Sequence, residues 1–317
     1  MRLFQHASYR FIEKRKTAYV FSAAILLLGI GAMVFNVATL GTWLRYGVDF
    51  TGGSLVQVQF QDDVAVEELR AALGGVEITR FGDEGLHEFV IRAPVDEESS
   101  ISEVADEIER QVAVGLPGRP FEVVRTELVG AKVGNELEQK ALLAILFSFA
   151  LTLLYLAVRF ELRFGLAAVI ATAHDILITL GFLALFRLEI ALPTVAAILT
   201  ILGYSLNDTI IVFDRIRENL GMKGARKRDP VELVDQSINE TLPRTVLTSG
   251  TTLAVLVALL VLGGAVIRDF TIVLILGVVV GTYSSIFVAS PALIEIQKRW
   301  GVGGIGEKKK RPEPATV

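Results

Sequence analysis

Six stretches of almost uninterrupted hydrophobic residues divide the chain. Each contains close to the ~20 residues that an α-helix needs to cross the ~30 Å hydrocarbon core of a bilayer. They cover residues 18–38, 139–158, 165–186, 192–213, 245–264 and 270–293. The first stretch continues to Leu40 and is longer than the apolar region of a cleaved secretion signal. The pattern therefore predicts six membrane-spanning helices, the first of which is retained as an anchor.

The segment 39–135, between the first two spans, changes its hydrophobic period repeatedly. Apolar and polar residues alternate in strand-like pieces, whereas apolar residues recur every three or four positions in helix-like ones. Asp63 precedes the first helical pattern and Ser99 or Ser100 precedes the second, as helix-capping residues do. The expected strands are 55–60, 75–81, 87–92 and 121–129. The order strand–helix–strand–strand–helix–strand predicts a small ferredoxin-like α+β domain.

Charge separates this segment from the remainder of the chain. The segment carries 18 acidic and 8 basic side chains, and the other residues carry 17 acidic and 23 basic ones. Basic residues gather at both ends of the chain and after the second and fourth spans, which is typical of cytoplasmic loops. We therefore expect both termini in the cytoplasm and the α+β domain outside.

The expected organisation has five parts. They are a cytoplasmic N-terminal segment (1–17), a first transmembrane helix (18–38), an extracytoplasmic domain (39–135), transmembrane helices two to six (136–300) and a basic cytoplasmic tail (301–317). The composition agrees with a membrane protein, because 52% of the residues are hydrophobic and the mean hydropathy is +0.54. The chain has no cysteine, which excludes disulfides and thiolate chemistry.

The fourth span carries polar residues where a simple anchor would carry Leu or Val. Its sequence GYSLND places Asn207 and Asp208 between two apolar runs. A carboxylate near the centre of a membrane helix costs about 2.5–3.5 kcal/mol on insertion scales, so such groups usually face a bundle interior and serve a function. We expect Asp208 to titrate on an ion path. The alternative is a hydrated carboxylate near the cytoplasmic surface, with Asn207 at a kink.

Two other spans add groups suited to proton transfer. His174 and Asp175 lie about ten residues, or ~15 Å, from the cytoplasmic start of the third span. Pro243 suits the first turn of the fifth span, which would place Arg244 in or just below the bundle. A guanidinium beside a carboxylate favours its charged form, which suits proton passage. The alternative is a static buried ion pair that fixes helix packing.

The remaining motifs have simpler interpretations. Gly277 and Gly281 form a GxxxG face that favours close packing of the sixth span. The GVGGIG sequence at 301–306 follows a membrane helix rather than a strand, so we interpret it as a linker and not as a nucleotide site. The KKKRP run is typical of a solvated tail that contacts anionic lipid or a partner. We expect no metal site, cofactor, hydrolytic site or nucleic-acid partner.

Several blocks resemble the SecD/SecF family of protein-export membrane proteins. GVDFTGG at 47–53 resembles the family signature just outside the first span. Ala-His-Asp at 173–175, GYSLNDTIIVFDRIREN at 203–219 and NETLPRTVLTSGTTL at 239–253 are similar to further family blocks, and the likeness extends over about 1–300. The signature residues are Gly47, Asp49, Phe50, Thr51, Gly52 and Gly53.

The resemblance implies a transport function. It implies a subunit that works with SecD beside the Sec channel (SecYEG), with YajC as a further partner, in the bacterial inner membrane. Such a subunit uses the proton-motive force to draw unfolded preproteins outward and is not an enzyme. It also implies half of a twelve-span exporter of the RND superfamily, with SecD supplying the other half and a companion aspartate.

The resemblance also implies roles for individual residues. The family's proton-path residues are an Asp in the fourth span and an Arg at the start of the fifth, which correspond to Asp208 and Arg244. His174, Asp175 and Asn207 are expected to complete the relay.

Two alternatives stay open from the sequence. A small-molecule proton antiporter of RND type is disfavoured, because the chain has one small outer domain instead of large porter domains. A non-conducting scaffold of the translocase complex would use Asp208 and Arg244 only as a buried pair, and the sequence does not separate it from a proton-driven subunit.

Overall fold

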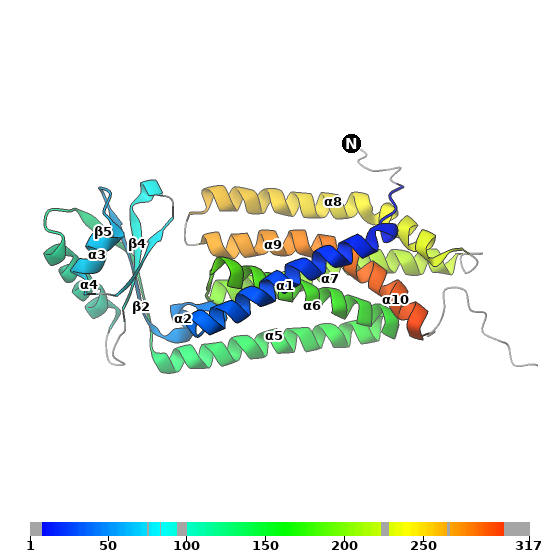
Figure 1. The fold of residues 1–317 in the computed structure, drawn as a ribbon, viewed down its shortest axis with the longest axis horizontal. Helices are drawn as coiled ribbons and strands as arrows, with labels where there is room; N and C mark the ends of the chain where they lie inside the picture. Colours follow the sequence, from blue (N-terminus) through cyan, green and yellow to red (C-terminus); the bar gives the residue numbers. More distant parts are fainter. Residues whose placement is uncertain are drawn as a thin grey trace, which may run out of the picture.

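The computed structural model describes residues 8–74, 76–82, 84–93, 100–222, 228–264 and 267–300. A bundle of long helices forms one part of the molecule, and a small α+β domain lies beyond one end of it (Figure 1). We call the opposite end of the bundle the distal end. Turn residue 83, the loop residues 223–227 and the tail at 301–317, with its GVGGIG and KKKRP runs, lie outside the described residues.

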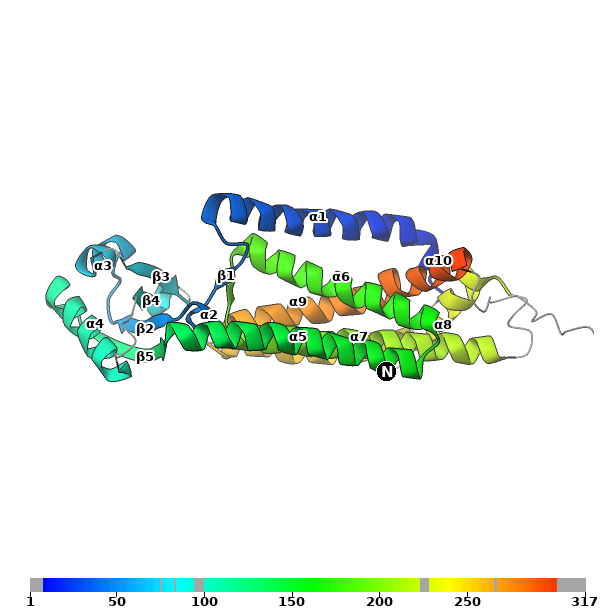
Figure 2. The same ribbon diagram turned by 90° about the horizontal axis from the view of Figure 1, so that it is seen from below.

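In the part of the chain that the structure describes, six helices are long and apolar enough to cross a membrane, as the sequence predicts. They are α1 (Arg15–Leu40), α5 (Ala131–Arg159), α6 (Leu162–Phe186), α7 (Leu192–Gly221), α8 (Pro230–Leu262), and α9 (Arg268–Ser284) with its continuation through a π-helical turn (Ser285–Ala289) into α10 (Ser290–Trp300). A short 3₁₀ helix (Ile12–Lys14) leads into α1. All six run along the long axis of the bundle (Figures 1 and 2).

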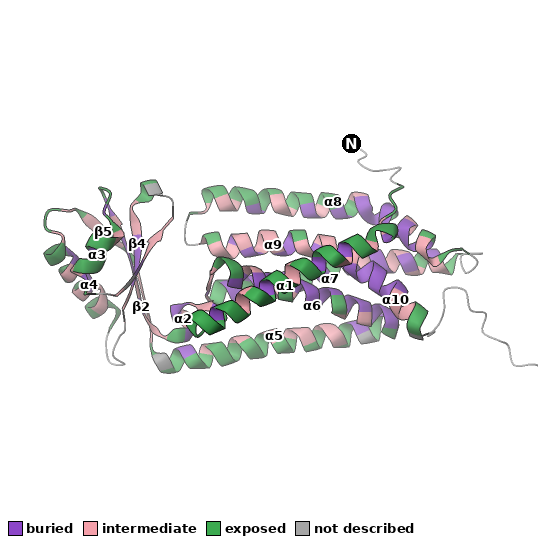
Figure 3. Cartoon of the chain, viewed as in Figure 1, coloured by how far each residue is buried: buried purple, intermediate pink, exposed green. Residues whose placement is uncertain are grey.

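The helices differ in how far they are buried. α5 and α8 lie at opposite edges of the bundle, with α6, α7 and α9 between them (Figure 1). Buried residues concentrate on α6, α7 and α9, whereas most of α1 and α5 is exposed (Figure 3). Helix α1 packs mainly against α6. Polar side chains that need shielding from lipid are therefore expected on the three central helices.

Two expectations about the fourth and fifth spans are wrong. The spans expected at 192–213 and 245–264 leave residues 214–244 as their connection, but α7 continues to Gly221 and α8 already begins at Pro230. Pro243 consequently lies inside α8 and not in its first turn. Hydropathy marks only the part of a helix that hydrocarbon covers, so it misses polar extensions that side-chain contacts hold together.

The small domain has the predicted ferredoxin-like plan. Its elements are β2 (Gly53–Phe60), α3 (Val66–Ala72), β3 (Glu77–Phe81), β4 (Glu88–Ala93), α4 (Ile101–Gly115) and β5 (Phe121–Val129). The strands form one antiparallel sheet in the order β3-β4-β2-β5. Both helices pack on one face, where Val58, Leu69, Phe89 and Val112 are fully buried. The domain thus has a hydrophobic core of its own.

The two predicted helix caps have different outcomes. Ser100 caps α4, since its hydroxyl accepts the N–H of Glu103 and the Glu103 carboxylate accepts the N–H of Ser100. This reciprocal bonding lowers the pKa of Glu103, so its contribution is present above the ordinary carboxyl pKa and is lost as the pH falls. Asp63 does not cap α3. Ala65 occupies the N-cap position, and Asp63 instead accepts a bond from Arg80.

Replacing Ser100 by Ala should destabilise the small domain by about 1 kcal/mol, because the first turn of α4 loses its side-chain acceptor. The measurement is the thermal unfolding of the purified domain, residues 39–135, followed by circular dichroism. Glu109→Ala, at an exposed position in the middle of the same helix, is the control and should change the melting temperature little. Equal melting of the wild type and S100A would contradict a stabilising cap.

Candidate functional site in the helix bundle

Asp208 lies about halfway along α7 and is buried, with 1% of its surface exposed. Its Oδ2 accepts long hydrogen bonds from Ser249 of α8 (3.5 Å) and Thr282 of α9 (3.4 Å). The two hydroxyls are 2.7 Å apart, and Tyr204 donates to Ser249 at 3.2 Å. The carboxylate is therefore surrounded by neutral hydroxyls. This burial contradicts the alternative of a hydrated group at the surface.

Arg244 does not lie in the bundle interior, which is one of the two positions that the sequence allows for it. It is exposed on α8, and no ion pair within 4.0 Å joins it to Asp208 among the described residues. Ser249, five residues further on, faces Asp208, and five helical residues correspond to a rotation of roughly 140°. The side chains of Arg244 and Ser249 thus leave α8 on different sides. A static buried pair between Asp208 and Arg244 is not formed in this chain.

A polar stripe in the spanning part of α7 is exposed. It consists of Thr200, Gly203 and Asn207, which follow one another at helical spacing. Asn207 therefore points away from the buried face that carries Asp208. On α8, Arg244 and Thr251 are exposed as well. Polar groups facing hydrocarbon are costly, so these surfaces are unsuited to lipid.

His174 and Asp175, at the centre of α6, form a second buried cluster. Oδ1 of Asp175 is 2.8 Å from Nδ1 of His174, and Oδ2 accepts from Ser205 of α7 at 2.5 Å and from Ser284 of α9 at 2.7 Å. Nε2 of His174 is 3.1 Å from the hydroxyl of Ser22 on α1. The cluster joins four helices through one carboxylate and one imidazole.

The two carboxylate clusters lie on the same helix pair. On α7, Ser205 bonds Asp175, and Asp208 follows three residues later on the same face. On α9, Thr282 bonds Asp208 and Ser284 bonds Asp175. The structure thus brings Asp208, Asp175 and His174 together around the contact of α7 with α9 and leaves Asn207 and Arg244 on the exposed side.

The glycines of the GxxxG motif lie at this same helix contact. A Cβ atom on Gly277 would come within 2.1 Å of the Ile201 side chain of α7. A Cβ on Gly281 would be 2.9 Å from Cβ of Ser205. Such distances are too short for a methyl group, so only glycine allows α9 to approach α7 this closely. Close approach also puts Ser284 and Ser205 within reach of one carboxylate.

The signature residues 47–53 connect the small domain to the bundle. Strand β1 (Arg45–Tyr46) pairs in parallel with β6 (Glu189–Ile190), which precedes α7. Gly47 then occupies the N-cap position of the short helix α2 (Val48–Thr51), and the Thr51 hydroxyl donates to the carbonyl oxygen of Gly47. We call residues 45–53, together with the first turns of α5 and α7, the GG junction.

The GG junction makes contacts that depend on its own residue types. Asp49 accepts the backbone N–H of Leu192 at 2.8 Å, so its carboxylate caps α7. Phe50 is buried between the helices. Gly52 and Gly53 have φ angles of 72° and 108°, which side chains rarely adopt. A Cβ on Gly134 of α5 would lie 2.9 Å from the Gly52 nitrogen. The junction therefore fixes where α5 and α7 begin.

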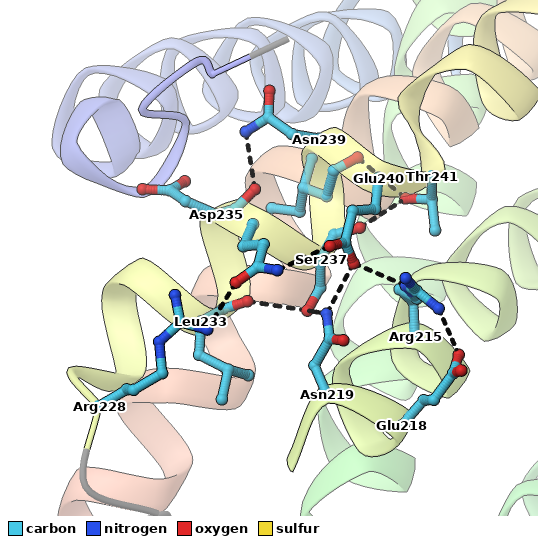
Figure 4. A network of polar contacts seen from close by, with 12 residues as sticks. Arg215, Glu218, Asn219, Arg228, Leu233, Asp235, Ser237, Asn239, Glu240 and Thr241 are labelled. Atoms are coloured by element: carbon cyan, nitrogen blue, oxygen red, sulfur yellow. Dashed lines mark hydrogen bonds and ion pairs between the residues drawn. The ribbon is translucent and has the colours of Figure 1, made fainter. Parts of the chain in front are cut away.

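A polar network at the distal end holds α7 to α8 and was not predicted (Figure 4). Glu240 accepts bonds from Arg215 at 2.6 Å and Asn219 at 2.8 Å, and Asn219 also donates to Ser237. A neighbouring set fastens the N-terminal segment: Asn239 exchanges two bonds with the backbone of Tyr9, and Asp235 accepts from the Ile12 N–H. The sequence feature that could have predicted this network is the repetition of polar residues every four positions before Pro243. Among the described residues, no three His, Asp or Glu side chains gather to hold a metal ion.

Comparisons with known proteins agree with this architecture. The family model described as protein export membrane protein SecD/SecF, C-terminal, matches residues 115–299, and the model of the SecD/SecF GG motif matches residues 37–64. The second match contains the GG junction residues 45–53. The first contains both carboxylate clusters except for Ser22.

Similar proteins cover nearly the whole chain. Protein translocase subunit SecF of Gemmatimonas aurantiaca is 44% identical over 95% of this chain and 90% of its own length. The subunit of the same name from Desulfurispirillum indicum is 42% identical over 94% of this chain and 96% of its own. The crystal structure of SecDF from Thermus thermophilus, a translocon-associated membrane protein, matches with a TM-score of 0.79 and 39% identity. This chain spans 94% of its own length but only 40% of the SecDF chain. The chain belongs to the SecF family of protein translocase subunits.

Proposed function

We propose that this subunit uses the proton-motive force to drive or complete preprotein export, with Asp208 as the group that takes up and releases the proton. The burial of Asp208 among neutral hydroxyls carries the proposal. A buried carboxylate with no ion-pair partner within 4.0 Å is costly when charged. Asp208 can therefore bind a proton in this buried arrangement and release it when water or a cation approaches.

Arg244 is the cation that we assign to the charged state. It is exposed on α8 in this chain, on a helix that also supplies Ser249 to Asp208. A movement that brings the guanidinium toward Asp208 would stabilise the carboxylate and release its proton. Withdrawal of Arg244 would restore proton binding. His174 and Asp175 extend the proton relay. Asn207, on the exposed stripe of α7, lies along the path by which the proton reaches Asp208.

SecD is the partner that we propose for the exposed polar stripe of α7 and α8. Thr200, Asn207 and Arg244 cannot face lipid at low cost, so a partner surface or a water-filled path should cover them. The matched SecDF chain is much longer than this one, and its remaining length supports a missing half. Repeats about an axis along the membrane normal place sites at their interface. SecYEG, YajC and unfolded preprotein are the further partners we propose, with no cofactor and no hydrolytic step.

We also propose that the chain lies in the bacterial inner membrane with both termini in the cytoplasm. The basic residues of the distal end support this orientation, since they include Arg10, Arg159, Arg215 and Arg228. The small domain is then extracytoplasmic. The segments expected from the sequence, 1–17, 18–38, 39–135, 136–300 and 301–317, remain our proposed division.

Cysteine labelling should establish this orientation, because the native chain has no cysteine. A membrane-impermeant maleimide added to intact spheroplasts should label L86C in the exposed turn before β4 and should not label R228C, which is exposed at the distal end. Permeabilised spheroplasts are the control in which both positions react. Labelling of R228C alone would invert the topology.

The two alternatives predict different behaviour. An RND-type antiporter would bind small molecules in large outer domains, whereas the described outer part consists of one four-stranded sheet with two helices. A scaffold would need no exchangeable proton, and the long bonds to Asp208, at 3.4 and 3.5 Å, are a weak way to fix packing. The proton-driven subunit fits both observations.

Export by inverted membrane vesicles tests the proposal. Vesicles that lack this chain and SecD should recover preprotein translocation when both are restored, and a protonophore should remove the recovered part. A scaffold predicts recovery that the protonophore leaves intact. An antiporter predicts no recovery but a change in small-molecule efflux.

A further inference from the structure

Helix α8 carries a row of buried hydroxyl residues at four-residue spacing. They are Ser237, Thr241, Thr245 and Ser249, with 0, 8, 2 and 5% of their surfaces exposed. Residues four positions apart lie one turn above one another on the same side of a helix. The row therefore runs from the distal end of α8 toward the centre of the bundle. We call these four residues the hydroxyl row.

Both ends of the hydroxyl row contact α7. At the distal end, Ser237 accepts a bond from Asn219 at 2.9 Å (Figure 4). At the inner end, the Ser249 hydroxyl donates to Asp208 at 3.5 Å. These two contacts pair residues in opposite order along the two helices, so α7 and α8 are antiparallel. The row thus lies along the seam between them and ends at the proposed proton carrier.

A polar cavity of about 550 Å³ lies beside the distal end of the row, between the N-terminal segment and α8. Five of its lining residues are acidic and two are basic. Such an excess of carboxylates attracts cations, including protons. One of the acids is Glu240, which binds the same Asn219 amide group as Ser237 does. Glu240 therefore connects the cavity to the start of the row.

The row is interrupted at Thr245. This residue is 2% exposed, yet its hydroxyl has no hydrogen-bond partner among the described residues. Thr241 donates to the backbone of its own helix and does not reach it. The antiparallel register places Val212 of α7, which is buried and apolar, opposite Thr245. A buried hydroxyl without a partner is costly, so the position favours a small hydrogen-bonding molecule, and water is the one at hand.

The spacing of the row suits one water molecule for each step. Successive members are about 6 Å apart along the helix axis, and two O–H···O bonds of about 2.8 Å span about 5.5 Å. One water between Thr241 and Thr245, and another between Thr245 and Ser249, would complete a chain of hydrogen bonds. Hydroxyl groups and water both donate and accept, so such a chain passes a proton while its members stay neutral afterwards.

We propose that the hydroxyl row is the path by which a proton leaves Asp208 for the distal end of the bundle, and that Thr245 binds the connecting waters. The inference rests on the proposed function of Asp208 and specifies its exit route. The O–H bond of Asp208 breaks, Ser249 accepts that proton and passes its own to the next water, and the transfer repeats along the row.

The two ends of this transfer are balanced by charged groups. The last proton passes from Ser237 to the carboxylate of Glu240, one turn away, and from there to the solvent of the cavity. The ionised Asp208 that remains is stabilised by the approach of Arg244. Because the row is interrupted in the described structure, Asp208 keeps its proton there. The path conducts once water enters at Thr245, which prevents a continuous leak.

The variant Thr245→Val removes the hydroxyl and keeps the shape of the side chain. Proton flux is measured in liposomes that contain the chain, SecD, SecYEG and translocating preprotein, and is expressed per inserted complex. We expect the flux to fall about tenfold in Thr245→Val, the change in rate that corresponds to one lost hydrogen bond. Thr245→Ser keeps a hydroxyl and should retain most of the flux.

The matched control is Thr172→Val. Thr172 is 2% exposed in the distal half of α6, and its hydroxyl is bound to the carbonyl oxygen of Ala168 at 2.9 Å. This variant also removes a buried threonine hydroxyl from a spanning helix, but not one of the row, and its flux should equal that of the wild type. A wild-type flux in Thr245→Val, or an equal fall in Thr172→Val, would overturn the proposal.

Infrared spectroscopy of the chain in lipid nanodiscs measures access to Asp208 without any partner. The carboxyl C=O band that disappears in Asp208→Asn belongs to Asp208, and its shift after transfer to heavy water follows the exchange of the proton. We expect this exchange to be about tenfold slower in Thr245→Val than in the wild type and unchanged in Thr172→Val. Equal exchange rates in the wild type and Thr245→Val would contradict a path through the row.

Failure of the path and failure of the proposed function give different results. A wild-type flux in Asp208→Asn would remove the proposed function. Loss of flux in Asp208→Asn together with full flux in Thr245→Val would leave Asp208 as the proton carrier and remove only the path.

Discussion

Replacing Asp208 by Asn is expected to reduce proton-driven export to the level of membranes that lack the chain. Asn is nearly isosteric and accepts the same bonds from Ser249 and Thr282, so the bundle should assemble normally. What the amide cannot do is bind and release a proton. Removing a buried carboxylate should even favour insertion, since its cost at the membrane centre is about 2.5–3.5 kcal/mol. Preprotein translocation into inverted vesicles, with SecD present, measures the effect.

The order of variants distinguishes a relay from a scaffold. Asp208→Glu should retain part of the activity, because the carboxylate survives although its reach changes. A scaffold predicts the reverse, since the longer charged side chain disturbs packing more than Asn does. Asp214→Asn is the matched control on the same helix: its half-exposed carboxylate pairs with Arg159 and Arg217, and such pairs contribute about 0–1 kcal/mol. Export by the Asp214 variant should stay close to wild type.

Replacing Gly52 by Ala should uncouple the small domain from the bundle. Gly52 has a φ of 72° and a ψ of 175°, a region that is nearly closed to other residues and costs on the order of 1–3 kcal/mol to hold. Relief of that strain would shift α2 away from α5 and from the start of α7. We expect export to fall while membrane insertion and the level of the protein remain normal. Export assays combined with limited proteolysis of the junction check both parts.

Two glycines at the start of α5 provide the comparison for the Gly52 experiment. Gly134→Ala should produce the same defect, because its Cβ would approach the Gly52 nitrogen to 2.9 Å. Gly130→Ala is the control: it lies just before α5, has an ordinary φ of −63°, and would meet no atom within 4 Å. A defect of equal size in all three variants would indicate general damage to this segment and would contradict a specific junction.

The parts of the fold that follow a regular period could be predicted from the sequence. A helix that crosses the membrane needs a run of about 20 apolar residues, and a strand with one buried face needs alternating apolar and polar residues. Both patterns can be recognised in a single sequence. The six spans, the ferredoxin-like plan and the cap at Ser100 followed from such local rules. The failure at Asp63 has the same origin, because its carboxylate pairs with Arg80, 17 positions away in the sequence, and no local pattern records that contact.

The neighbours of Asp208, His174 and Asp175 could not be predicted from the sequence, because tertiary contacts determine them. Placing Arg244 at the start of the fifth span required α8 to begin near residue 243, but bonds such as Glu240 with Asn219 extend the helix to Pro230. The polar character of His174, Asp175 and Asp208 was visible in the sequence. Which hydroxyls face them was not, since Ser22, Ser205 and Ser284 come from three different helices.

Proton flux through the assembled complex tests the central claim most directly. The chain and SecD are reconstituted in liposomes that contain a pH-sensitive dye, and a pH gradient is imposed in the presence of translocating preprotein and SecYEG. We predict a flux that depends on the complex and falls to the leak of empty liposomes in the Asp208→Asn variant, with the Asp214→Asn control unaffected. A flux in the Asp208→Asn variant equal to that of the wild type would contradict the proton-transfer role of Asp208.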